Sequence, residues 1–316
     1  MNPTLQGYSA AVIEAADRAA VGGIAAELEA IEQLAMSSAP LRAALTDTSV
    51  PGAARRAVMA DLLEGKVSAE ARRLAAFACR VVPAPHVPAA LAWLSARARH
   101  DAEGRAMEEP PLSLTQARER VAGYATALFE DMSNDALESL EDDLFRFARI
   151  VGATPGLRAA LTDRDLEAPA RRGLVSQLLE GKVPATTLAL VRYTVTGGRA
   201  RDIVGTLNFL VEQTAAARGW RIAHVRAAAP IAEAQQATLT DSLGTLTGGP
   251  VELQVVIDES LLSGAIIRIG DLQVDATARG RIDALREHLV PAGWESSGFG
   301  SAGRGHETTA QTEGAD

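Results

Sequence analysis

An internal repeat constrains this chain of 316 residues more than any other feature of its sequence. The segments LRAALTD and LLEGKV each occur twice, with the second occurrence 116 residues after the first. Between 41–67 and 157–183, 16 of 27 ungapped positions are identical, where composition alone would give about two to four. Tyr8 and Tyr124 extend the same offset. The repeat predicts that the first two thirds of the chain is one domain written twice.

Each copy has the apolar spacing of helices. In the second copy, Ser113 and Gln116 form a capping-box pattern, and Asn134 is a candidate N-cap for the next helix. That helix carries apolar residues at helical spacing, and Gly152 is predicted to end it. Further helices are expected over about 157–161, 169–179, 187–195 and 203–214, with the first copy in parallel. The pattern predicts six helices per copy.

A different periodicity follows the second copy. In 251–257, apolar residues alternate with Glu252 and Gln254, which predicts a half-buried strand with one apolar and one mostly polar face. After a short excursion, Gly264 precedes a second strand, and 272–275 is expected to pair back on it. A strand over 220–229 and a helix over 231–246 come before this sheet, and a helix over 276–289 follows it.

The predicted fold class is α+β and mostly α, with two six-helix bundles followed by a small strand–helix–strand–strand–helix domain. The predicted divisions are a helical bundle at 1–103, a linker at 104–112, a second bundle at 113–218, the α/β domain at 219–289 and a disordered tail at 290–316.

The stretch 251–270 resembles the carboxy-terminal signature of the delta subunit of F-type ATP synthases, the bacterial relative of the mitochondrial oligomycin-sensitivity-conferring protein. The matching residues are Val251, Leu253, Ile257, Asp258, Leu261, Ser263, Gly264, Ala265, Ile267, Arg268 and Gly270. Such subunits ordinarily carry one bundle and one small domain, equivalent here to 113–289. The bundle at 1–103 is additional. A duplicated bundle also resembles actinobacterial fused b-delta subunits, but their membrane helix and long b-like helix are not seen in this sequence.

The resemblance implies a non-catalytic stator subunit that links the α3β3 catalytic head to the b stalk, so its partners are the α, β and b subunits. It also implies a location on the cytoplasmic face of the cell membrane, reached only through the complex. In the family, a groove between the first and fifth helices holds an α-subunit amino-terminal helix. The residues implied for this contact are Val121, Tyr124, Leu128, Leu188 and Val191. The alternative for each residue is a place in the bundle core.

Other functions have little support in the sequence. The net charge of −9 offers no general attraction to nucleic acid, and no apolar segment reaches the roughly 18 residues needed to cross a bilayer. Cys79 is the only cysteine, and the five histidines lack metal-binding spacing. The GxGxxG pattern at 298–303 does not join a strand to a helix. We therefore expect no catalytic residue, metal or cofactor. The alternative function is an unrelated helical adaptor or regulator with no ATPase partner.

Overall fold

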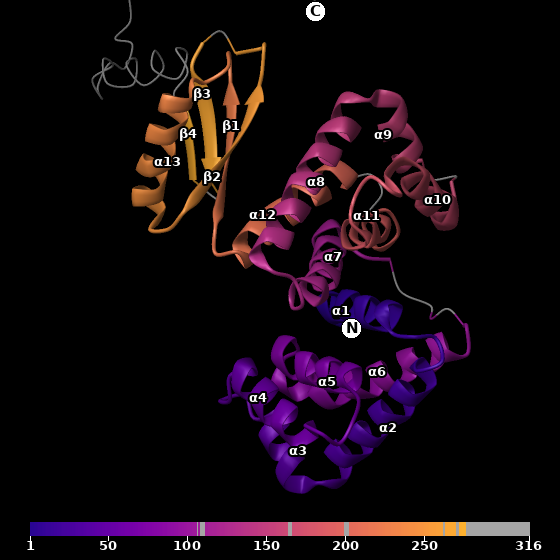
Figure 1. The fold of residues 1–316 in the computed structure, drawn as a ribbon. Helices are drawn as coiled ribbons and strands as arrows, with labels where there is room; N and C mark the ends of the chain where they lie inside the picture. Colours follow the sequence, from indigo (N-terminus) through magenta and orange to yellow (C-terminus); the bar gives the residue numbers. More distant parts are fainter. Residues whose placement is uncertain are drawn as a thin grey trace, which may run out of the picture. The chain divides into compact units, whose positions relative to one another are not determined.

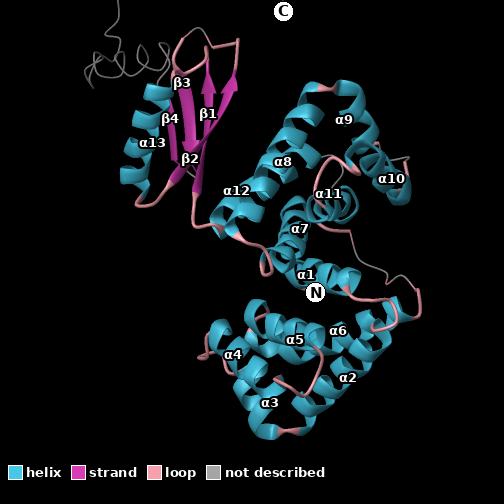
Figure 2. Cartoon of the chain, viewed as in Figure 1, coloured by secondary structure: helices cyan, strands magenta, loops and turns pink. Residues whose placement is uncertain are grey.

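The computed structural model describes residues 1–105, 107, 111–163, 166–198, 202–261, 263–269 and 272–275. These residues are mostly helical and include one small four-stranded sheet (Figures 1 and 2). They form two compact units, one of residues 1–222 with 244–252 and one of residues 223–243 with the described residues from 253 onward. The predicted helix at 276–289, the tail at 290–316 and Gly270 lie outside the described residues.

The helices of the first repeat are α1 Pro3–Ala15, α2 Val21–Ser37, α3 Ala39–Thr46, α4 Gly52–Leu63, α5 Ala69–Val81 and α6 Val87–Ala102, with a short 3₁₀ helix at Ala84–His86. Those of the second repeat are α7 Leu114–Phe129, α8 Asn134–Ala153, α9 Pro155–Thr162, α10 Ala168–Leu179, α11 Ala185–Gly197 and α12 Ile203–Ala217. In the first repeat, α2 packs against α6 and α4 against α5; in the second, α8 packs against α12 and α10 against α11.

Local sequence explains where these helices begin and end. The capping box of Ser113 and Gln116 is present, with both reciprocal hydrogen bonds formed. The prediction that Asn134 caps α8 was wrong, because the Ser133 side chain accepts the hydrogen bond from Ala136 N at 3.3 Å. Gly152 does not end α8 either. The helix continues to Ala153, and Thr154 is its C-cap. Thr154 precedes Pro155, and a proline ring disfavours helical backbone angles at the residue before it.

The sheet consists of β1 Arg221–Ala227, β2 Val251–Ile257, β3 Ala265–Ile269 and β4 Leu272–Asp275, in the order β2-β1-β3-β4, and α13 Glu233–Thr247 connects β1 to β2. Strand β3 is antiparallel to both neighbours, and Ile267 lies opposite Val225 on β1 and Val274 on β4. Strands β1 and β2 are parallel, as expected for strands that a helix connects. The prediction that β4 pairs back on β3 is confirmed.

The predicted one-sided burial of β2 was wrong. Val251 and Gln254 are both buried although their side chains point to opposite faces, and Ile257 is 44% exposed. Strand β2 lies at the edge of the sheet, so the environment of each residue depends on what covers that edge locally. The alternation of apolar and polar residues in the sequence does not show what covers this edge of the sheet.

Gly264 is a position where only glycine fits without strain. Its φ is +83°, and its carbonyl accepts the hydrogen bond from Ala228 N at 3.0 Å at the start of β3. We predict that Gly264→Val lowers the free energy of unfolding of the sheet by about 3 kcal/mol, because a β-branched side chain is strained at positive φ. Hydrogen exchange measured over 221–275 should accelerate, while exchange in α7 to α12 stays unchanged.

Gly249→Val is the matched control, because Gly249 lacks a positive φ and a Cβ there would meet nothing within 4 Å. Equal acceleration in both variants would show that the backbone angle at Gly264 does not matter.

Candidate functional site

The first helices of the two repeats, α1 and α7, pack directly against each other through two glycines. A Cβ on Gly7 would lie 1.7 Å from the carbonyl oxygen of Arg120, and one on Gly123 would lie 1.9 Å from that of Thr4. Thr4 and Arg120 are themselves 116 residues apart, as are Gly7 and Gly123. The contact is therefore reciprocal, as in an interface around a twofold axis. We call it the α1–α7 seam.

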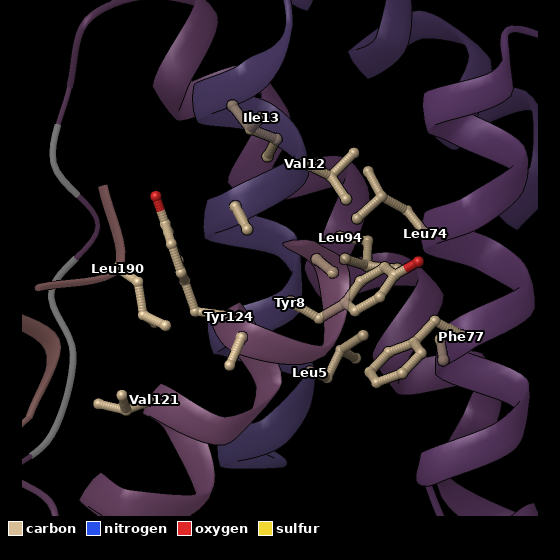
Figure 3. Close-up of a cluster of buried hydrophobic side chains, with 14 of the residues drawn as sticks. Leu5, Tyr8, Val12, Ile13, Leu74, Phe77, Leu94, Val121, Tyr124 and Leu190 are labelled. Carbon is tan, nitrogen blue, oxygen red and sulfur yellow. The ribbon is translucent and has the colours of Figure 1, made fainter. Parts of the chain in front are cut away.

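Two tyrosines repeat this symmetry on either side of the glycines. The hydroxyl of Tyr8 donates to Glu130 at 2.7 Å, and the hydroxyl of Tyr124 donates to Glu14 at 3.0 Å. The ring of Tyr8 stacks on Phe77 with centroids 3.7 Å apart, and that of Tyr124 stacks on the equivalent residue, Tyr193, at 4.0 Å. Figure 3 shows Tyr8 beside Phe77 and Tyr124 beside Leu190.

Burial affects the chemistry of these tyrosines. Tyr8 and Tyr124 are 1% and 2% exposed, and burial together with the nearby carboxylates raises the pKa of both phenols far above the usual value. Both side chains stay protonated and donate a hydrogen bond across the seam. Each repeat thus contributes a tyrosine donor to one carboxylate of the other repeat.

One ion pair breaks the symmetry. Arg73 on α5 donates to the carbonyl oxygen of Ala127 and to Asp131, each at 2.9 Å, and its guanidinium lies 3.2 Å from Glu130. The equivalent position in the second repeat is Ala189, which has no charge to offer. The first repeat therefore holds α7 through Arg73 on α5, and Ala189 cannot make the matching bond to α1.

A cavity of about 220 Å³ opens along the seam. It is lined by Ala11, Val12, Ala15, Ala16 and Glu70 of the first repeat and by their equivalents Ala127, Leu128, Asp131, Met132 and Thr186 of the second, together with Arg73. The alanines leave room that larger side chains would fill. The cavity is mainly apolar, with the pair of Arg73 and Asp131 among its polar groups.

The structure brings the residues predicted for the α-subunit contact onto two packed helices, α7 and α11. Four of them are buried, namely Val121, Tyr124, Leu188 and Val191. Leu128 is half-buried and lines the seam cavity. Because four of the five side chains are buried, most of the predicted contact surface is covered by the chain itself.

The carboxy-terminal signature builds the connection between β2 and β3. The carboxylate of Asp258 accepts from Ser260 N at 3.0 Å and from Arg226 Nε on β1 at 2.9 Å. The hydrogen bonds from Ser260, supported by Arg226, lower the pKa of Asp258 to about 2. Among the signature residues that follow Asp258, the backbone N–H of Leu261 donates to the carbonyl oxygen of Asp258. Ile267 is buried, and Ser263, Gly264 and Arg268 are exposed.

A second cluster of charges surrounds Arg218 at the end of α12. Its guanidinium lies 2.8 Å from Glu141 on α8, 3.2 Å from Glu138 and 3.5 Å from Glu252, the second residue of β2. The same group lies 5.3 Å from the ring centroid of Trp220. Burial and the nearby Glu252 raise the pKa of Glu141 to about 7, against the opposing effect of Arg218.

Sequence reasoning missed the seam, although part of its signal was visible. Tyr8 and Tyr124 are part of the repeat, and Gly7 and Gly123 directly precede them. A small residue at the same position in both copies, on a face that continues with Ala11 and Ala127, indicates close helix packing. The charges around Arg218 lie too far apart in sequence to be recognised as a cluster.

Some features are absent from the part of the chain that the structure describes. None of its helices combines the length and apolarity required to cross a bilayer. Within the same residues, no group of three or more His, Cys, Asp or Glu side chains is placed to hold a metal ion.

Comparison with known proteins identifies relatives over most of the chain. The family model described as ATP synthase delta (OSCP) subunit matches residues 5–83 and 121–289. ATP synthase subunit delta of Parafrankia sp. is 35% identical over 84% of this chain and 86% of its own length, and that of Nocardia farcinica is 33% identical over 84% and 88%. The Thermobifida fusca subunit is 40% identical over 59% and 69%.

A solved structure gives a weaker likeness. One chain of the Toxoplasma gondii mitochondrial ATP synthase hexamer is similar with a TM-score of 0.39 and 15% sequence identity, over 54% of this chain and 96% of that chain. This likeness is too low to carry an argument.

The seam leads to a prediction about Gly7. In Gly7→Ala, the new Cβ meets a backbone carbonyl that no change of rotamer can move, so α1 and α7 must separate and lose packing. We expect the free energy of unfolding, measured with urea, to fall by about 3 kcal/mol. Gly123→Ala should cost a similar amount, and the double variant less than the sum, because the first substitution already opens the seam.

Gly22→Ala is the control, because a Cβ at Gly22 on α2 meets nothing within 4 Å. Its stability should stay the same or rise slightly, since alanine favours helix. If the double variant loses the sum of the free energies of unfolding lost in Gly7→Ala and Gly123→Ala, the two glycines do not belong to one shared contact.

Glu141 leads to a prediction about pH. Its pKa is raised from 4.5 to about 7 in the folded protein, so the folded state binds its proton more tightly than the unfolded chain does. The resulting stabilisation is complete below pH 4.5 and is lost as the pH rises to 7. Between pH 5 and 7.5, the free energy of unfolding should fall by about 2 kcal/mol more in the native protein than in Glu141→Gln. Parallel curves of stability against pH would show that Glu141 does not titrate as described.

Proposed function

Because the chain belongs to the ATP synthase delta (OSCP) subunit family, we propose that it joins the α3β3 catalytic head to the b subunit of the peripheral stalk. The chain is a stator subunit of an F-type ATP synthase. The single observation that carries this conclusion is the family match over 5–83 and 121–289. The relatives from Parafrankia and Nocardia support it, since each is similar over most of its own length.

The mechanism that we propose is mechanical. A rotor that turns inside the head exerts torque on it, so the head must be held against rotation for the torque to drive ATP synthesis. A stator subunit needs packed helices, stiff connections and partner surfaces. We propose that this chain has no catalytic activity and no cofactor of its own, and that it lies on the cytoplasmic face of the membrane as a peripheral component.

We propose that the helical part consists of two bundles that arose by duplication, at 1–103 and 113–218, with 104–112 as linker and 219–289 as the carboxy-terminal domain. Two sets of equivalent contacts support this division. The helix pairs α2–α6 and α4–α5 have the counterparts α8–α12 and α10–α11. The contacts of Tyr8 and Tyr124 across the seam are displaced by the same 116 residues as the sequence repeat.

The α-subunit contact is proposed at the α7–α11 groove, formed by Val121, Tyr124, Leu128, Leu188 and Val191. Leu128 provides its accessible edge, because its side chain is half-buried and lines the seam cavity. The four buried residues shape the groove from beneath. We propose that the carboxy-terminal domain, which contains the signature Asp258, Leu261, Ser263, Gly264, Ile267, Arg268 and Gly270, contacts the b subunit.

Leu128→Glu tests the head contact. The substitution puts a charge at the apolar edge of the groove, and we expect binding to the isolated α3β3 head to weaken by about tenfold or more in surface plasmon resonance. Binding to the b subunit should stay unchanged. Leu114→Glu on the same helix is the control, because Leu114 is 38% exposed at the opposite end of α7. Equal weakening by both variants, or by neither, would place the head contact elsewhere.

A further inference from the structure

A second apolar groove lies on the helical unit, between α8, α9 and α10. Its volume is about 370 Å³. The floor and walls are formed by Phe147, Ile150, Leu157, Leu178, Leu179 and Val183. Ile150 is 53% exposed, which is unusual for a large aliphatic side chain beside other apolar residues. None of the five residues proposed for the α-subunit contact lines this groove.

The equivalent region of the first repeat contains a hydrogen bond that the second repeat cannot make. Glu27 on α2 accepts from the backbone N–H of Ser68 at 3.1 Å and from its hydroxyl. The position equivalent to Ser68 is Pro184, which has neither an N–H nor a hydroxyl. Leu63 is 3% exposed, whereas its equivalent, Leu179, is only partly buried. The two repeats therefore differ at this leucine, which is more accessible in the second repeat.

The charges at the rim indicate what the groove can accept. Asp143 is turned inward, with a side chain 9% exposed, and its carboxylate accepts from Arg146 at 2.7 Å and from Thr187 at 3.3 Å. Arg146 has a side chain 69% exposed, and Lys182 is exposed with its ammonium 2.8 Å from the carbonyl oxygen of Leu178. The accessible charges that line the groove are thus two cations, and they complement a negatively charged occupant.

We propose that this groove binds an acidic amphipathic helix of a partner protein. The walls are helices whose backbone groups are already hydrogen-bonded, so an added strand would find no sheet edge to pair with. An apolar helix face fits such a floor through side chains spaced at i, i+3, i+4 and i+7. Carboxylates beside that face reach Arg146 and Lys182. The inference does not depend on the proposed stator function.

The test uses the full chain and a fluorescent peptide of about 16 residues, roughly four helical turns, with leucines on one face and glutamates on the others. Two control peptides carry lysine in place of glutamate, or the same composition with the leucines distributed around the helix. We expect fluorescence anisotropy to show binding of the acidic peptide at least tenfold tighter than binding of either control. Arg146→Glu combined with Lys182→Glu should reverse the preference towards the lysine peptide.

Ile150→Glu should weaken binding of the acidic peptide by at least tenfold. The matched control is Leu34→Glu, because Leu34 is the equivalent residue of the first repeat, is 42% exposed and does not line this groove. It should leave binding unchanged, with circular dichroism confirming that both variants are folded. The proposal is overturned if the acidic peptide does not bind, if the distributed-leucine peptide binds equally well, or if Ile150→Glu and Leu34→Glu have the same effect.

Discussion

The approach of two helix backbones at Gly7 and Gly123 determines how the helical unit is built. A carbonyl oxygen of the opposite helix occupies the space where a Cβ would stand at each position, so any other residue separates α1 from α7. This contact places Tyr8 and Tyr124 within reach of carboxylates on the opposite repeat. It also covers the Gly123 side of α7, so the surface available to a partner depends on the seam.

The carboxy-terminal domain depends on a different kind of constraint, the geometry of one connection. Asp258 binds both the turn that follows it and Arg226 on the neighbouring strand, and Gly264 supplies the positive φ that leads into β3. The residues by which the sequence resembles its family are thus, in large part, residues that the connection needs.

The sequence predicted regular elements well and the relations between them poorly. Ser113 with Gln116, the helices of the second repeat and the pairing of 272–275 follow from local patterns, and the structure contains them. The cap at Ser133 was misplaced by one residue, because both Ser133 and Asn134 are good caps and only the hydrogen bond decides. The repeat indicates that α1 and α7 are alike, but equivalence in sequence does not indicate that they touch. The burial of Gln254 depends in the same way on neighbours that are distant in the chain.

The continuity of the chain across the seam has a consequence for how the two repeats can vary. In a dimer of identical subunits every substitution appears on both sides of the axis, so a residue that suits one side must be tolerated on the other. In a single chain each side varies independently. Arg73 has no charged counterpart at Ala189, and Ser68 donates to Glu27 where Pro184 has no N–H to donate. Each half is thereby free to acquire contacts that the other half lacks.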